Sequence, residues 1–392
     1  MVARGILAGA LALALATGPD AAASALTAPT MALRAPEQCS PPHGGTQVGE
    51  SWAQRRLAFT GVWPLTKGEG VTVALIDSGV DTRHPQVRVA RSVDLTGTGP
   101  LDCVGHGTAV AGIIAGADMK EIPFAGVAPK ARLISIKQTN SERGDVALLA
   151  QGIKQAADLG AQVVNISVQT SDQPDLKAAV EYALAKDVVI VAAAGNIRKE
   201  DGTPAAVYPA SYPGVLSVGS AGPDGRRNDF SNSVTPVSVI APGQDITSTW
   251  PGGAYRQDLE GTSYAAPYVA GVAALVRARH PELDNVRVRR RIEITADGAS
   301  GTGTGAGMVN PLMAVSEILP SEVVAIAPRP AQALPSTIVT RPRPADQEAI
   351  NVSAAVAVIA VLAAGLVAAV GVVIPMGRRR GWRPGRAVTP GE

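Results

Sequence analysis

The 392-residue sequence is poor in aromatic residues, in cysteine and in net charge. Aromatic residues make up 3% of it, charged residues 17%, and the formal net charge is +2. A net charge so near zero gives no support for nucleic-acid binding. We interpret the basic run at 287–291 as a solvated helix face. The two cysteines, Cys39 and Cys103, are too few for a disulfide-built scaffold and wrongly spaced for a zinc site. We expect no metal and no cofactor.

Small apolar residues are abundant instead, and they fall into runs that alternate between strand and helix patterns. Residues 71–76 form a β-branched run that is too apolar for a half-exposed strand, as in parallel sheets covered on both faces. The sequence predicts further strands at 132–136, 162–166, 188–192 and 215–218, with helices between several of them, at 146–159 and 175–186. This alternation predicts an α/β fold, a doubly wound parallel sheet with helices on both faces.

The N-terminal 60 residues are predicted to form two segments outside the sheet. In residues 1–25, Arg4 precedes an apolar run that is too short to span a bilayer, and small residues follow a Thr-Gly-Pro breaker. This layout predicts a cleaved signal peptide, with an uncleaved anchor as the alternative. Residues 26–60 are mixed and rich in Pro and Gly, and we expect an extension that lies on the following domain.

The C-terminal segments predict a membrane anchor. Prolines recur through residues 321–349, which we interpret as an extended linker after a domain that ends near residue 320. Residues 350–376 are almost wholly apolar and long enough to cross a bilayer as one transmembrane helix. Arginines crowd the tail at 377–392, so the positive-inside rule places the tail in the cytoplasm and the folded domain outside the cell membrane.

Ser263 stands where an Ala/Val-rich stretch with helical spacing begins, after Gly261 and Thr262. A hydroxyl at a helix N-terminus can attack a carbonyl while the backbone N–H groups there stabilise the oxyanion that forms. The alternative is that Ser263 only caps a core helix. A nucleophile needs a base and an orienting acid, so the interpretation depends on the rest of the chain.

Asp77 and His106 supply those two groups. Asp77 ends the first predicted strand, where open α/β sheets place functional groups, and His106 begins another small-residue helix. Of the four histidines, the other three (His43, His84 and His280) lie in stretches that favour surface or capping roles. The sequence therefore predicts a catalytic triad of Asp77, His106 and Ser263.

The chain order Asp, His, Ser on a parallel α/β pattern resembles the subtilisin-like serine proteases. The resemblance covers residues 62–318 of a predicted peptidase domain at 61–320, and it rests on motifs that match in order. They are 76–81 (IDSGVD) with His84-Pro85, 105–112 (GHGTAVAG), 193–196 (AAGN), 261–267 (GTSYAAP) and 308–310 (MVN). The resemblance implies an endopeptidase that works through an acyl-enzyme.

Further roles follow from this resemblance. Asn196 would donate its side-chain amide to the oxyanion, beside the Ser263 N–H. Ser167, Val168 and Gly195 would bind the extended peptide substrate. Gln169 and Thr170 stand where many relatives have glycine, so we expect the primary specificity pocket to be narrower or partly blocked.

The order of the segments is similar to that of the mycosins, the membrane-anchored proteases associated with bacterial type VII secretion systems. This resemblance implies polypeptide substrates, a cell-membrane location and contacts with components of the secretion membrane complex. It also leaves open an alternative, in which the protein mainly stabilises that complex and proteolysis is secondary.

Export would place both cysteines where disulfides persist. Two free thiols close to an active site would be a liability there, whereas one bridge uses both. We therefore predict a Cys39–Cys103 disulfide that pins the extension beside the cleft, and two buried thiols are the alternative. In the chain-entropy model a loop of about 60 residues contributes at most roughly 4 kcal/mol.

Overall fold

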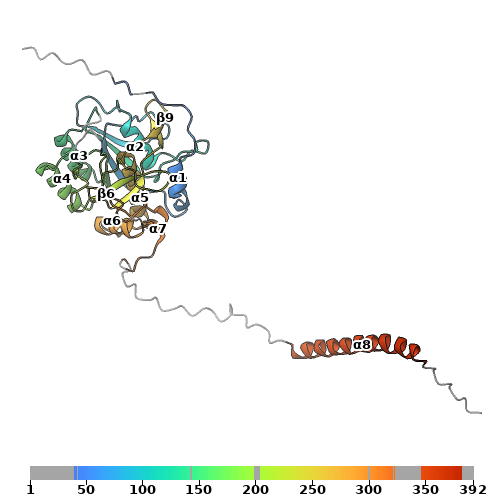
Figure 1. Cartoon of the computed structure of the whole chain (residues 1–392). Coiled ribbons are helices and arrows are strands. Elements are labelled where there is room, and N and C mark those ends of the chain that lie inside the picture. Colours follow the sequence, from blue (N-terminus) through green and yellow to red (C-terminus); the bar gives the residue numbers. More distant parts are fainter. Residues whose placement is uncertain are drawn as a thin grey trace, which may run out of the picture. The chain divides into compact units, whose positions relative to one another are not determined.

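The computed structural model describes residues 39–41, 43–141, 144–197, 204–298, 301–320, 322 and 346–381. The chain forms two compact units, Met1–Glu322 and Val323–Glu392 (Figure 1). The predicted signal peptide lies outside the described residues, as do most of the linker, the first part of the N-terminal extension and the end of the basic tail. The boundaries of those segments stay predictions.

A seven-stranded sheet runs through the first unit, and all its neighbouring strands are parallel. Its order is β2-β3-β1-β4-β5-β6-β7, so the chain winds to one side of β1 and then to the other. The doubly wound prediction is confirmed. The strands are β1 (Thr72–Asp77), β2 (Val89–Asp94), β3 (Arg132–Lys137), β4 (Val163–Ile166), β5 (Val189–Ala193), β6 (Leu216–Ala221) and β7 (Val239–Pro242).

Alternate residues of the strands pack under different helices. Val73 and Leu75 of β1 belong to the core beneath α2 (His106–Ala115) and α5 (Thr262–Arg279). Ala74 and Ile76 belong to the core beneath α3 (Val146–Asp158) and α4 (Pro174–Ala185), as the period of two in a strand requires. Both faces are thus covered, which explains why the strands read as continuous apolar runs.

An antiparallel hairpin lies beyond the sheet, formed by β8 (Ile246–Trp250) and β9 (Ala254–Leu259). It is held to α2 because the hydroxyls of Ser248 and Thr249 donate to carbonyls of that helix. The contact is close: a Cβ at Gly112 would lie 2.1 Å from the Thr249 hydroxyl oxygen. The hairpin therefore forms a fixed wall near the start of α2.

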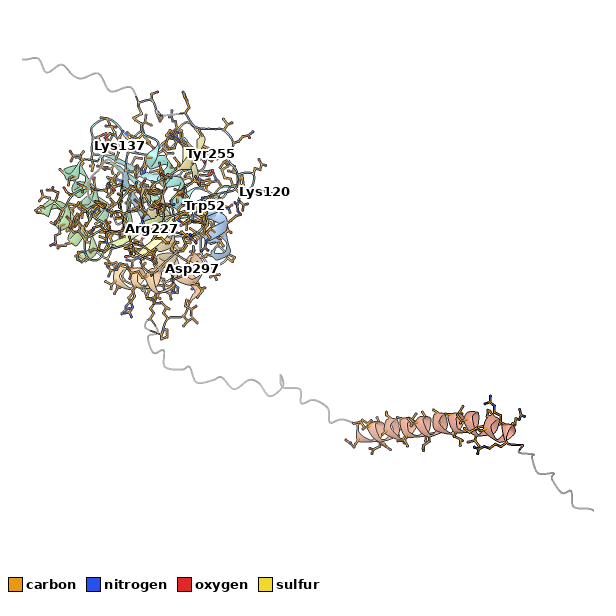
Figure 2. All side chains as sticks on the ribbon, viewed as in Figure 1. Trp52, Lys120, Lys137, Arg227, Tyr255 and Asp297 are labelled. Atoms are coloured by element: carbon orange, nitrogen blue, oxygen red, sulfur yellow. A yellow bond between two sulfur atoms is a disulfide. The ribbon has the colours of Figure 1, made fainter. Side chains whose placement is uncertain are left out.

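Four short elements complete the first unit: α1 (Trp52–Leu57), the 3-10 turn η1 (Phe59–Val62), α6 (Asn285–Ile294) and α7 (Pro311–Ser316). The prediction of a solvated basic face holds for Arg287 and Arg290, which are exposed, but it is wrong for Arg291 of α6. Arg291 is only 2% exposed and pairs with Glu322 at 2.6 Å. Its guanidinium also donates to the carbonyls of Ala314 and Glu317. In the view of Figure 2, Lys137 and Tyr255 lie in the upper half of this unit and Asp297 lies in the lower half.

The predicted Cys39–Cys103 disulfide is present. The chain that follows Cys39 lies against the hairpin, where Gly45 and Tyr255 exchange two backbone hydrogen bonds of 2.8 Å. The described part of the N-terminal extension is therefore fastened both to the loop before α2 and to β9.

The second unit contains one described helix, α8 (Gln347–Arg379), which includes the segment predicted to be transmembrane. Its 33 residues have the length and the apolar composition needed to cross a membrane. None of its side chains is buried within the chain, as expected of a helix that faces lipid or other proteins.

Candidate active site

Asp77 is the last residue of β1, at the carboxyl edge of the sheet beside the point where the winding reverses. Its side chain is 2% exposed. The Oδ1 atom accepts hydrogen bonds from the backbone N–H of Ser78 at 2.8 Å and from the Ser78 hydroxyl at 3.2 Å. These bonds fix the carboxylate so that it points toward the start of α2.

His106 is the first residue of α2, and its Nδ1 lies 2.7 Å from Oδ1 of Asp77. Two glycines permit this approach. Gly105 has a φ of 94°, which a residue with a side chain rarely adopts. A Cβ at Gly107 would lie 2.0 Å from the carbonyl oxygen of Gly79 and 3.2 Å from the Asp77 carboxylate. The glycines of this motif therefore bring the two backbones together.

Asp102 holds the beginning of α2 through hydrogen bonds, and it was not among the site residues predicted from the sequence. Its Oδ1 accepts from the backbone N–H groups of Val104 and Gly105 and from the Ser78 hydroxyl. Its Oδ2 accepts from the N–H and the hydroxyl of Thr108. Burial raises the pKa of this carboxyl, and these hydrogen bonds oppose the rise. The cue in the sequence was that Asp102 lies in the loop that leads into the predicted helix, four residues before His106.

The loop that carries Asp102 is itself fastened by Lys137, at the end of β3. The Lys137 ammonium donates to the carbonyls of Gly99 and Leu101 at 2.9 and 2.7 Å. Its side chain is buried, and burial lowers its pKa. The disulfide at Cys103 holds the same loop, so the backbone before His106 is tied down on several sides.

Ser263 is the second residue of α5, after Gly261 and Thr262. Pro267 lies within this helix and has no N–H, so the Ser263 carbonyl lacks its usual helical partner. The Ser167 hydroxyl takes that place and donates to the Ser263 carbonyl oxygen at 2.8 Å, while Asn165 donates to Ser167 at 2.9 Å. The hydroxyl of Ser167 thus holds the backbone of Ser263 in position.

Asn196 follows β5, and its amide orientation is fixed by Thr262. Oδ1 of Asn196 accepts from both the backbone N–H and the hydroxyl of Thr262, at 3.0 Å each, which leaves Nδ2 turned toward Ser263. A Cβ built on Gly261 would lie 3.1 Å from the Ser263 hydroxyl oxygen and 3.2 Å from Nδ2 of Asn196. A small space that both groups face therefore lies beside Gly261.

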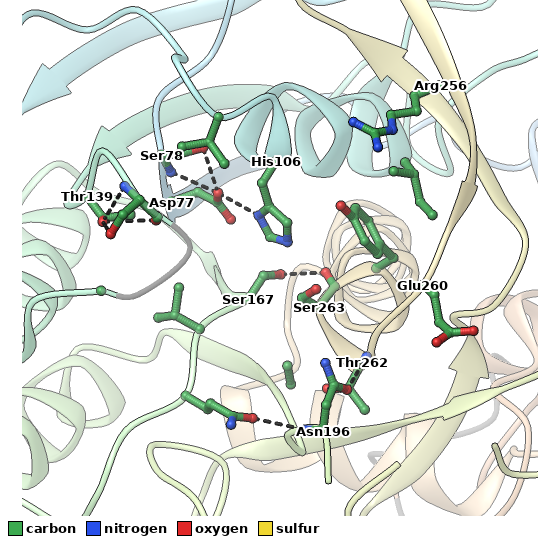
Figure 3. A pocket seen from close by; sticks show the side chains of 18 of the residues that line it. Asp77, Ser78, His106, Thr139, Ser167, Asn196, Arg256, Glu260, Thr262 and Ser263 are labelled. Atoms are coloured by element: carbon green, nitrogen blue, oxygen red, sulfur yellow. Dashed lines mark hydrogen bonds and ion pairs between the residues drawn. The ribbon is translucent and has the colours of Figure 1, made fainter. Parts of the chain in front are cut away.

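One cleft of about 780 Å³ is lined by Asp77, His106, Asn196 and Ser263. Asp77, His106 and Ser263 follow one another across it, with Asn196 below Ser263 in this view (Figure 3). Of the four histidines, all within the described ranges, His106 alone lines the cleft. In the part of the chain that the structure describes, no group of three or more His, Cys, Asp or Glu side chains is arranged to hold a metal ion.

The remaining predicted site residues lie on the wall beneath Ser263. Ser167 and Val168 line the cleft, whereas Gly195 is buried and its N–H donates to the Thr262 hydroxyl at 3.1 Å. Gln169, expected to narrow the pocket, also lines this wall. Its Oε1 accepts from the backbone N–H of Asn196 at 2.9 Å.

The opposite wall comes from the hairpin and the start of α5. The ring of Tyr264 packs against the imidazole of His106, with centroids 5.0 Å apart. Arg256 lies over the Trp250 ring at 4.7 Å. The hairpin was not predicted from the sequence. Pro251-Gly252-Gly253 marks its turn, but β8 and β9 are short and lack the continuous apolar runs of the central strands.

A sequence profile of the subtilase family, peptidase S8, matches residues 68–311, which include all the residues of this cleft. The chain belongs to the subtilase family. It is similar to thermitase of Thermoactinomyces vulgaris, with 39% identity over 67% of this chain and 95% of that protein. This subtilase is therefore a serine endopeptidase.

The mycosin branch of the family matches beyond the protease domain. Mycosin-4 of Mycobacterium tuberculosis is 38% identical, over 87% of this chain and 86% of its own. A crystal structure of MycP1 with its N-terminal propeptide removed superimposes with a TM-score of 0.64 at 36% identity, covering 69% of this chain and 98% of that one. MycP3 from the type VII (ESX-3) secretion system gives a TM-score of 0.60 at 38% identity, covering 71% and 91%. The protein is a mycosin-type subtilase.

Proposed function

We propose that this subtilase cleaves polypeptides outside the cytoplasmic membrane, with Ser263 as nucleophile, His106 as general base and Asp77 as the orienting carboxylate. The observation that carries the proposal is the 2.7 Å contact between the buried Asp77 carboxylate and the His106 imidazole, in the cleft that also holds the Ser263 hydroxyl. A carboxylate at Nδ1 keeps the proton on that nitrogen, so Nε2 is the unprotonated nitrogen that acts as the base.

In the first half of the reaction, the Ser263 oxygen attacks the carbonyl carbon of the scissile bond and its proton passes to Nε2 of His106. The electron pair of the C=O bond moves onto the oxygen and forms a tetrahedral oxyanion. The oxyanion then collapses, the C–N bond breaks, and His106 donates its proton to the departing amine. The acyl group remains on Ser263 as an ester.

In the second half, water replaces the amine. His106 removes a proton from the water as it attacks the ester, and returns that proton to the Ser263 oxygen when the carboxylic acid product leaves. His106 thus acts as base and acid in each half. Buried Asp77 stabilises the imidazolium that forms each time.

Asn196 and the backbone N–H of Ser263 would stabilise the oxyanion. The Cβ position built on Gly261, which the Ser263 hydroxyl and the Asn196 amide both face, lies 3.7 Å from the Ser263 backbone nitrogen. Thr262 holds the Asn196 amide in place beforehand, so little reorganisation is needed when charge develops. Loss of one such donor lowers turnover by about 10²–10³-fold in related chemistry.

We also propose that α8 anchors the enzyme as a single transmembrane span. Arg378, Arg379 and Arg380 follow its apolar part, so the positive-inside rule places the basic tail in the cytoplasm and the protease domain outside. Washing of membranes with alkaline carbonate tests this, because the full-length chain should stay in the pellet. Recovery in the supernatant would contradict the anchor.

The likeness to MycP1 and MycP3 supports a place beside a type VII secretion system, with contacts to its membrane complex. A structural role in that complex is a second candidate, favoured by α8, whose whole surface is available to lipid or other spans. Loss of the complex in a deletion strain, rescued by the Ser263→Ala chain, would favour the structural role. Failure of that chain to restore secretion through an intact complex would favour proteolysis.

Hydrolysis of an unfolded protein by the detergent-solubilised full chain tests the catalytic proposal. Wild type and Ser316→Ala should be equally active, because Ser316 is exposed on α7 and only its hydroxyl is removed. Ser263→Ala should lose all measurable activity while its melting temperature stays the same. Equal activity in Ser263→Ala would contradict the proposed nucleophile.

A further inference from the structure

We propose that Gln169 restricts this enzyme to substrates with a small side chain, Gly, Ala or Ser, on the residue that contributes the scissile carbonyl. The inference rests on the proposed function, because it takes Ser263 as the nucleophile. It concerns the wall of the cleft formed by the segments after β4 and β5, which are adjacent parallel strands.

The position of that substrate side chain follows from the site geometry. The scissile carbonyl carbon must lie next to the Ser263 hydroxyl, with its oxygen near Nδ2 of Asn196 and the leaving amine on the side of His106. The side chain one bond away then points from the His106 side toward the wall that carries Val168, Gln169 and Asn196. What fills the space along this wall decides which residues fit.

Gln169 occupies that space. A Cβ built on Gly195 would meet the Gln169 side-chain oxygen at 2.6 Å and a methyl group of Val207 at 2.8 Å. Gly195 has a φ of 93°, so its open side faces these two side chains. The Gln169 and Val207 side chains therefore cover Gly195, which is buried. Without them, this glycine would leave a hollow between the two segments.

The Gln169 side chain is held at both ends. Its carboxamide oxygen accepts from the Asn196 N–H at 2.9 Å, and thus bridges the two segments. The backbone is held at the following residue, because Thr170 and Tyr208 exchange two backbone hydrogen bonds of 2.9 Å. A methyl or hydroxymethyl group fits beside the carboxamide, whereas a leucine or phenylalanine side chain would have to displace it.

Displacement would also disturb the oxyanion site. The nitrogen that Gln169 holds belongs to Asn196, whose side chain is the proposed oxyanion donor. A large side chain that pushes Gln169 aside removes one of the bonds that keep Asn196 in register. We therefore expect large residues to lower kcat as well as to raise KM.

The test is a peptide series with identical flanks, in which the residue before the scissile bond is Ala, Leu or Phe. The detergent-solubilised full chain is assayed as wild type, Gln169→Gly, Gln169→Ala and Gln169→Glu. Gln169→Glu keeps the length and an oxygen for Asn196. Gln173→Gly is the matched control, since Gln173 lies on the same segment but outside the cleft.

Wild type, Gln169→Glu and Gln173→Gly should cleave the Ala peptide at least about tenfold more efficiently, in kcat/KM, than the Leu or Phe peptide. Gln169→Gly and Gln169→Ala should lose most of that preference, because they leave room for large residues. Their kcat should fall on every peptide, because the bond to the Asn196 N–H is lost. An unchanged preference in both variants, or a wild type that prefers Leu or Phe, would overturn the inference alone. A wild type that cleaves no peptide would overturn the proposed function and this inference together.

Discussion

The Nδ1 atom of His106 and the Oδ1 atom of Asp77 lie 2.7 Å apart, and the carboxylate is almost fully removed from water. The two residues are 29 positions apart in the chain and come from a strand end and a helix start. The start of α2 reaches the end of β1 because Gly107 carries no side chain, while Gly105 takes the positive φ of the turn before the helix. This pair is the basis of the first prediction.

Asp77→Asn should lower kcat by about 10⁴-fold. The asparagine amide would donate to Nδ1 of His106, so the imidazole proton would move to Nε2 and the base would be lost. Asp224→Asn is the control, since Asp224 only accepts from a backbone N–H in an exposed turn. Turnover is measured together with the melting temperature, and an Asp77→Asn enzyme within tenfold of wild type would refute the role of the carboxylate.

Gly261→Ala should abolish turnover even if the protein folds. The added methyl would lie between the Ser263 hydroxyl and the Asn196 amide, at 3.1 and 3.2 Å, in the space proposed for the oxyanion. The φ of 145° adds backbone strain. Gly61→Ala is the control, because no atom lies within 4 Å of its new methyl group. Substantial peptidase activity in Gly261→Ala would place the oxyanion elsewhere.

His84 should make the fold less stable in mild acid. Its Nε2 lies 3.0 Å from the Ala254 carbonyl oxygen, and its Nδ1 accepts from the Gln86 N–H. Burial lowers the pKa of His84, against the opposing effects of the Ala254 carbonyl and Asp81. The unfolded chain therefore takes up a proton below about pH 6.5 that the folded chain resists, and stability falls as the pH falls through that region.

The measurement is urea unfolding between pH 7.5 and 5 in wild type and in His84→Gln. The variant keeps a donor and an acceptor but does not titrate, so its stability should fall less over this range. His43→Gln, a change at an exposed position, should behave as wild type. Parallel stability profiles for wild type and His84→Gln would rule out this source of acid sensitivity.

Breaking the Arg291–Glu322 pair should destabilise the protease domain. The Arg291 side chain is 2% exposed and that of Glu322 is 12% exposed, so removing either partner leaves a buried charge, at a cost of about 3–5 kcal/mol. Glu322→Ala should show this loss in urea unfolding, and the exposed Glu282→Ala should not. If both variants unfold at the same urea concentration, the pair does not support the domain.

The sequence predicts the centre of the fold better than its edges. Strands β1, β3, β4, β5 and β6 are identifiable because burial on both faces demands continuous apolar runs. β2 at the sheet edge is half exposed and carries polar residues, so it does not stand out. β7 is as buried as β4, but Pro242 cuts its apolar run short. Local patterns identify an element only where burial shapes its whole composition.

The site shows the same division. Glycines and strand ends mark Asp77, His106 and Ser263 in the sequence, because close backbone approach needs particular residues. Asp102, by contrast, acts through bonds to its own loop, to Ser78 and to Thr108 of α2, which no periodicity reveals. The burial of Arg291 likewise depends on Glu322, which lies 31 residues away.

The most direct measurement of the central claim is covalent labelling by a fluorophosphonate. An activated Ser263 oxygen should displace fluoride from phosphorus, and mass spectrometry of the digested full chain should find the phosphonyl group on Ser263. Labelling should be absent in Ser263→Ala and reduced by orders of magnitude in His106→Ala, and Ser316→Ala should label as wild type does. A wild-type chain that stays unlabelled, or carries the label on another residue, would contradict the account.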